Sequence, residues 1–117
     1  MRRFLLGAAV ALSLAGPAAA QRSGTYDVTG ANPDGTEYQG TMLLTQVGLA
    51  SFRVVWQIGQ DVIEGVAMVS GLTLATAFSL GGQPGMGIYE IRRDGTLEGQ
   101  WTTVGAFAAG RETARPR

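Results

Sequence analysis

The chain has 117 residues, 45% of them hydrophobic, and nine basic residues, all arginine, offset nine acidic ones. Its length fits a single domain. Because basic and acidic residues are equal in number, the composition does not indicate a basic surface of the kind that binds nucleic acid. Because histidine and cysteine are both absent, the composition excludes disulfide bonds, thiol or histidine catalysis, and zinc sites built from these ligands.

The N-terminal segment has the pattern of a secretory signal peptide. The basic pair Arg2-Arg3 precedes an apolar run, Phe4–Leu14, and the small residues Ala18–Ala20 fit the cleavage pattern. The apolar run is shorter than the roughly 20 residues that a membrane-spanning helix needs. We therefore expect residues 1–20 to form a cleaved helical signal peptide and residues 21–117 to form one domain. The mature protein is then periplasmic or secreted, without membrane attachment.

The rest of the chain consists of short β-rich runs separated by turns that contain glycine, without the apolar period of a helix. Since almost every connection is short, each strand is expected to pair antiparallel with the next. The fold class is all-β, an eight-stranded up-and-down meander that closes into a small barrel because no helix covers its apolar face. The expected strands span residues 24–31, 36–46, 51–58, 61–69, 72–79, 86–92, 96–104 and 109–114.

Turn residues mark the points where consecutive strands are joined. Asn32-Pro33-Asp34-Gly35 combines a proline that fixes φ, a side chain that can bond its own backbone, and a glycine that accepts positive φ. Asp94-Gly95 repeats the last two residues of this turn. The glycine-rich run from Gly81 to Gly85 is expected to be a flexible turn before the strand at 86–92. Each of these stretches is explained by turn formation.

Alternation of apolar and polar residues assigns one inward face to each strand. In the strand at 61–69 the face without Glu64 is expected to point inward, since a buried carboxylate needs a partner. Glycines on the inner faces would let the strands bend sharply. The expected inward residues are Tyr38, Gly40, Met42, Leu44, Phe52, Val54, Trp56, Ile58, Ile63, Gly65, Ala67, Val69, Leu72, Leu74, Thr76, Phe78, Leu97, Gly99, Trp101 and Thr103.

No catalytic, cofactor or metal site is expected. Glu37, Glu64, Glu90 and Glu98 fall mostly on outer faces, so a pair of catalytic carboxylates is not predicted. Glu112 is expected at the rim, with a buried position beside an arginine as the alternative. The two turn aspartates lack the spaced oxygen ligands of a calcium loop.

The aromatic side chains have two interpretations. The simpler one is that Tyr26, Tyr38, Trp56, Phe78, Tyr89 and Trp101 fill the core. In the alternative, the barrel is hollow and Tyr38, Trp56, Tyr89 and Trp101 bind a small apolar ligand.

Two motifs carry a family resemblance. Gly24–Gly40 has the pattern G-x-Y-x-V-x-G-x-N-P-D-G-x-x-Y-x-G, and Asp94–Trp101 has the pattern D-G-x-L-x-G-x-W. The chain thus resembles small exported proteobacterial proteins often labelled fibronectin-binding, which implies adhesion to a matrix protein. Its expected architecture is similar to that of avidin-like and lipocalin-like barrels.

The sequence therefore predicts an exported, non-enzymatic binding module without a cofactor. In the leading hypothesis its surface or loops engage a protein partner, such as a matrix or envelope protein. In the alternative it is a small-molecule carrier of the lipocalin or avidin type.

Overall fold

In the computed structural model, which describes residues 23–117, the chain forms eight strands and no helix. The expected signal peptide lies outside the described residues. No helix in residues 23–117 has the length and hydropathy to cross a membrane. The strands are β2 (Gly24–Ala31), β3 (Glu37–Gln46), β4 (Ser51–Ile58), β5 (Asp61–Ser70), β6 (Thr73–Leu80), β7 (Gln83–Ile91), β8 (Leu97–Thr103) and β9 (Gly110–Pro116).

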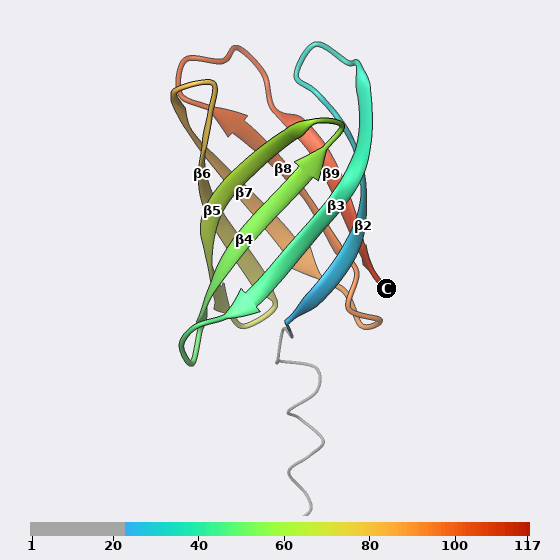
Figure 1. Ribbon diagram of the computed structural model, residues 1–117, viewed down its shortest axis with the longest axis vertical. Coiled ribbons are helices and arrows are strands. Elements are labelled where there is room, and N and C mark those ends of the chain that lie inside the picture. Colours follow the sequence, from blue (N-terminus) through green and yellow to red (C-terminus); the bar gives the residue numbers. More distant parts are fainter. Residues whose placement is uncertain (1–22) are drawn as a thin grey trace, which may run out of the picture.

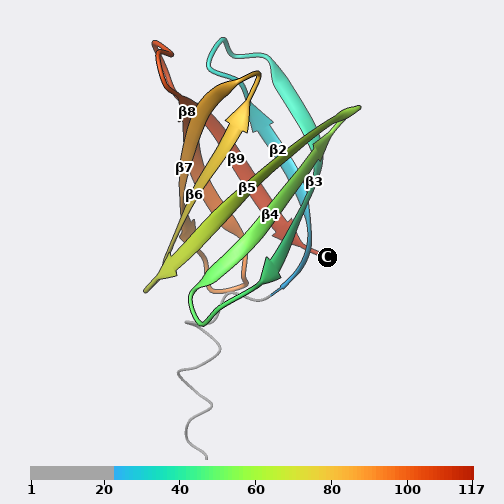
Figure 2. The same cartoon turned by 60° about the vertical axis from the view of Figure 1, so that its left-hand side comes forward.

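The strands form a closed antiparallel barrel in simple chain order, as the sequence predicts. Each strand pairs with the next, and β9 returns to β2 through partners from Ala31↔Arg111 to Tyr26↔Pro116. Closure leaves no sheet edge open to further pairing. Figures 1 and 2 show the tilted strands wrapping around a single interior.

Alternate connections lie at opposite ends of the barrel. We call the end where β2 begins the lower end; it carries the connections at 47–50, 71–72 and 92–96. The upper end carries the connections at 32–36, 59–60, 81–82 and 104–109. Figure 1 shows these two ends at the bottom and top of the barrel.

The two Asp-Gly turns have the same construction, although they lie at opposite ends. Gly35 donates its amide to the Asn32 carbonyl at 2.8 Å, and Asp34 Oδ1 accepts from the Thr36 amide at 3.0 Å. At 92–96, Gly95 and Asp94 make the corresponding bonds at 2.9 Å each. Both glycines have positive φ, 92° and 88°. Hydrogen bonds from the threonine two residues on lower the pKa of each aspartate.

Two expected boundaries were wrong. The turn expected at Gly81 to Gly85 is shorter: Gly81 and Gly82, with φ of 59° and 81°, make a two-residue turn, and β7 begins at Gln83 instead of residue 86. Paired positive φ values match the twist of a tight hairpin, so no longer loop is needed. The last strand also continues to Pro116 instead of fraying after Ala114, because β2 provides it with partners.

The lower part of the interior is filled. The inward faces follow the predicted alternation, including that of β5, where Ala67 is buried and Glu64 is exposed. The inward position expected for Leu72 is wrong, because this residue lies in the turn before β6 and is 56% exposed. Side chains such as Met42, Leu44, Val54, Leu74 and Leu97 have no exposed surface. This packed cluster closes the lower half of the barrel and forms the floor of the space above it.

Candidate ligand-binding cavity

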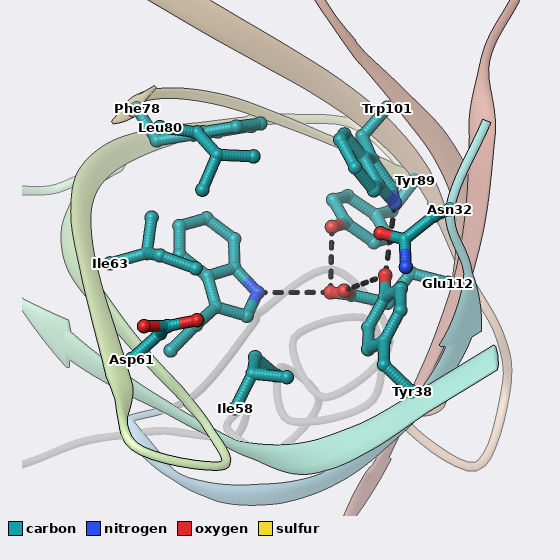
Figure 3. A pocket seen from close by; sticks show the side chains of 11 residues that line it. Asn32, Tyr38, Ile58, Asp61, Ile63, Phe78, Leu80, Tyr89, Trp101 and Glu112 are labelled. Carbon is teal, nitrogen blue, oxygen red and sulfur yellow. Dashed lines mark hydrogen bonds between the residues drawn. The ribbon is translucent and has the colours of Figure 1, made fainter. Parts of the chain in front are cut away.

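A cavity of about 200 Å³ occupies the upper half of the barrel. It reaches from the packed cluster to residues at the upper strand ends, such as Asn32, Asp61 and Leu80, and is not sealed there. Figure 3 shows the side chains around it. The lining residues are Asn32, Tyr38, Trp56, Ile58, Asp61, Ile63, Phe78, Leu80, Tyr89, Trp101 and Glu112.

At the centre of this lining is the carboxylate of Glu112, on β9. The residue is only 6% exposed, and three neutral donors from three other strands bond to it. Trp56 Nε1 and the Tyr89 hydroxyl donate to Oε2 at 2.9 and 2.8 Å, and the Tyr38 hydroxyl donates to Oε1 at 2.7 Å. Figure 3 shows the carboxylate close to the hydroxyl groups of Tyr38 and Tyr89. These hydrogen bonds partly replace the water that the carboxylate loses on burial.

A fourth donor extends the network. Trp101 Nε1 donates to the Tyr38 hydroxyl at 2.9 Å. An indole N–H can only donate, so the Tyr38 oxygen accepts here and its own hydrogen is free for Glu112. The Arg111 carbonyl is a more distant acceptor for that hydrogen, at 3.4 Å. All members of the network thus have a consistent direction of donation, which ends on the carboxylate.

This network keeps both tyrosines protonated. Burial raises the pKa of Tyr38 and Tyr89 well above the usual value for tyrosine, and the negative charge of Glu112 and the hydrogen bond to it raise it further. Each hydroxyl therefore remains a donor throughout the neutral pH range.

Three glycines leave the space into which the aromatic rings fit. A Cβ atom on Gly85 would overlap the ring of Phe78, and one on Gly110 would overlap the indole of Trp101. A Cβ on Gly30 would overlap the end of Tyr38. Small residues on neighbouring strands thus allow large rings to lie flat against the barrel wall, so that the centre stays open.

The rings form an almost continuous aromatic wall with edge-to-face contacts. The ring centroids of Trp56 and Phe78 are 5.3 Å apart, those of Phe78 and Trp101 6.2 Å, and those of Tyr38 and Trp101 6.3 Å. Such geometry is favourable for aromatic pairs and fixes the rings against one another. The aliphatic residues Ile58, Ile63 and Leu80 complete the wall.

The structure brings the four proposed ligand-binding residues, Tyr38, Trp56, Tyr89 and Trp101, together around one cavity. Two of these rings also fill the core: Trp56 and Tyr89 are 4% and 2% exposed and belong to the buried core cluster. Tyr26, which is 4% exposed, belongs to that cluster and does not line the cavity. The interior is filled in its lower half and hollow in its upper half.

The expected rim position of Glu112 is also wrong, and its partners are tyrosine and tryptophan side chains instead of an arginine. The missed signal was the alternation of β9. Arg111 and Arg115 alternate with Gly110, Glu112 and Ala114, so the charged face must point outward and Glu112 inward. The rim position was expected because a buried carboxylate needs hydrogen-bond partners. The donors to Glu112 come from strands that are distant in the chain, so no partner is visible near it in the sequence.

One other carboxylate shares the cavity with Glu112. Asp61, at the upper end of β5, also lines the cavity but is exposed, and Glu90 and Glu98 pair with Arg92 on the outer surface. In residues 23–117 no group of three acidic side chains could hold a metal ion.

Comparisons with known proteins support the fold. No protein-family model matches this chain, and no curated protein matches it. The redesigned β-barrel mFAP1, solved with DFHBI bound, matches with a TM-score of 0.70 at 22% identity, over 87% of this chain and 100% of that one. A fluorescence-activating barrel designed de novo matches at 0.64 and 19%, over 86% and 97% of the two chains. A mutant of the fluorescent protein UnaG matches at 0.55 and 14%, over 83% and 96%. These likenesses show a shared small closed barrel.

Proposed function

We propose that this barrel binds a compact, mainly apolar small molecule in its upper half, and that it acts by binding and not by catalysis. The observation that carries this proposal is the aromatic cavity above a fully packed floor. Ligand sites are typically concave and mostly apolar, with a few polar groups that fix orientation. Here the polar groups are those of the Glu112 network.

The fold comparison supports the same proposal. The structure of mFAP1 carries the small molecule DFHBI, so a barrel of this size can serve as a binding protein. Our proposal rests on the cavity of this chain, since a shared fold does not by itself imply a shared ligand.

Intrinsic tryptophan fluorescence tests the proposal directly, because the chain has two tryptophans and both line the cavity. Indole, benzamide and DFHBI would be titrated into the purified protein. We expect a saturable change in tryptophan emission with at least one of them, and a weaker affinity in Trp101→Phe than in the surface control Glu64→Gln. An unchanged emission with all three probes would contradict the proposal.

We also propose that the protein works outside the cytoplasm, on the strength of the basic, apolar and small-residue pattern of residues 1–20. Mass spectrometry of the protein from periplasmic and culture fractions should find a chain that starts at Gln21. A full-length chain confined to the cytoplasm would refute export.

A protein partner remains a second candidate, which the comparisons do not support. The observation in its favour is an apolar patch on the outer face of β5, β6 and β7, where Val66 and Met86 flank Ala77, and Met68 and Ile88 flank Ala75. The larger four are at least half exposed, and exposed apolar patches often mark interaction sites. Binding of the purified protein to immobilised fibronectin, lost in Met68→Lys, would support this function; no binding would remove the matrix hypothesis.

A further inference from the structure

We propose that the cavity selects an organic cation with a compact apolar body, and that Glu112 holds its charged N–H group. This proposal rests on the proposed function and names the class of ligand for the same site. It follows from the charges inside the barrel, the free acceptor site on Glu112, the aromatic wall and the size of the cavity.

The lining carries negative charge without a compensating cation. Two of the lining residues, Glu112 and Asp61, are acidic and none is basic. The arginines of residues 23–117 are exposed, and their ion pairs, Arg92 with Glu90 and Glu98 and Arg117 with Asp27, lie on the outer surface. A buried charge without an opposite charge is costly, and an entering cation would supply it. An anionic ligand would instead meet repulsion.

The hydrogen bonds to Glu112 suit a carboxylate that accepts from its neighbours. Trp56 can only donate, and Tyr38 must donate because its oxygen already accepts from Trp101. A protonated carboxyl could place its hydrogen only on the Tyr89 hydroxyl, since Trp56 cannot accept and the Tyr38 oxygen already accepts from Trp101. The arrangement therefore matches an acceptor that carries the charge.

One acceptor site on this carboxylate remains for a ligand. A carboxylate has about four lone-pair sites, and Oε2 uses two of them for Trp56 and Tyr89, whereas Oε1 uses one for Tyr38. Figure 3 shows both oxygens within the ring of lining side chains. A ligand N–H group that reaches Oε1 would donate to the fourth lone-pair site.

The walls suit an organic cation better than a metal ion. Aromatic faces attract cations through their quadrupole, and this attraction is strongest where water is excluded. The nearby rings of Trp56, Phe78 and Trp101 provide such faces on several sides. A metal ion would find only one buried carboxylate there, whereas an organic cation also buries apolar surface against Ile58 and Ile63.

The size of the cavity restricts the ligand further. About 200 Å³ lies below the range of roughly 300–1,000 Å³ that is common for drug-sized ligands. One ring with a charged substituent is thus a suitable probe.

Three probes with the same ring and nearly the same shape separate charge from fit: benzamidine, which is a cation at neutral pH, the neutral benzamide, and the benzoate anion. Calorimetric titration of the purified protein should show benzamidine binding at least ten-fold more tightly than benzamide, and benzoate most weakly. In Glu112→Gln the cation preference should disappear while benzamide still binds. Glu64→Gln, which removes an exposed carboxylate on the outer face of β5, should keep the preference.

The order of affinity of the three probes for the unmodified protein tests the inference even if Glu112→Gln does not fold. Equal affinity for benzamidine and benzamide, or tightest binding of benzoate, would overturn the inference about ligand class and leave small-molecule binding intact. Failure of all three probes, together with indole and DFHBI, would overturn both proposals. A cation preference that persists in folded Glu112→Gln would show that another group recognises the charge.

Discussion

At the scale of single residues, Glu112 links distant parts of the barrel. Its partners come from β3, β4 and β7, and Trp101 on β8 joins through Tyr38. Hydrogen bonds to a charged group contribute about 1.5–3 kcal/mol each, which is comparable to the several kcal/mol that desolvation of one ion costs. The network therefore holds a polar group inside an apolar barrel without a counter-charge.

The raised tyrosine pKa values predict a loss of stability at alkaline pH. Both groups have the usual pKa of about 10 in the unfolded chain and a higher one when folded. Above that pH the unfolded state binds fewer protons, so the free energy of unfolding falls as pH rises. The slope is up to about 1.4 kcal/mol per pH unit for the buried Tyr89, and less for the partly exposed Tyr38.

Denaturant unfolding at a series of pH values measures this slope, and the absorbance of phenolate in the folded protein gives an independent reading. Below pH 10 the tyrosines should contribute no slope, and Tyr89→Phe should flatten the alkaline limb. If all three tyrosines of the chain lost their protons near pH 10 while the protein stayed folded, the network would be wrong.

Thr76 offers a stabilising substitution. Its hydroxyl is buried and has no hydrogen-bond partner among the described residues. Thr76→Val has nearly the same shape and removes this unsatisfied group, so we expect a gain of about 1 kcal/mol in the free energy of unfolding. Thr76→Ser keeps the hydroxyl and should give no gain. A loss of stability in Thr76→Val would mean that the hydroxyl has a partner in solution.

At the scale of strands, inward glycines have two separate effects. A Cβ on Gly99 would overlap the backbone carbonyl of Ile88 on the neighbouring strand, and Gly40 and Gly65 face backbone carbonyls in the same way. These positions let adjacent strands approach closely. Gly85, in contrast, faces only the ring of Phe78, so it controls the space in the cavity.

Two alanine substitutions separate these effects. Gly99→Ala should lower the free energy of unfolding by about 1–3 kcal/mol, because backbone has to move. Gly85→Ala should push the Phe78 ring toward the cavity and weaken probe binding at least several-fold, with a smaller loss of stability. Thermal unfolding and fluorescence titration of both variants provide the readings. Equal effects on stability and binding in the two variants would argue against separate roles.

Much of this strand arrangement could be predicted from local sequence. Turn residues such as Pro33 and Gly35 fix where the hairpins lie, and period-two alternation fixes which side chains point inward. The position of Glu112 could be inferred from Arg111 and Arg115, but its donors could not. They are 23 to 74 residues away in the chain, and only barrel closure brings them together.

At the scale of the whole molecule, the barrel divides into a packed lower half and a hollow upper half. The sequence left this open because the inward residues of both halves are similar in kind. The difference depends on how the rings lie against Gly85 and Gly110. The alternation of inward and outward residues does not predict this packing. The packed half can maintain the fold while the upper half exchanges a ligand, since its fully buried side chains, such as Met42, Leu44 and Leu97, do not line the cavity.

The most direct test of the central claim, that the upper half binds a small molecule, is NMR titration of the two indole N–H signals. Trp56 and Trp101 give one signal each, and both line the cavity. With benzamidine, indole or DFHBI, we predict saturable shifts of both signals, while the methyl signals of Leu74 and Leu97 in the packed half stay in place. If neither indole signal moves with any probe, or if shifts are confined to outer residues such as Met68 and Ile88, the account is contradicted.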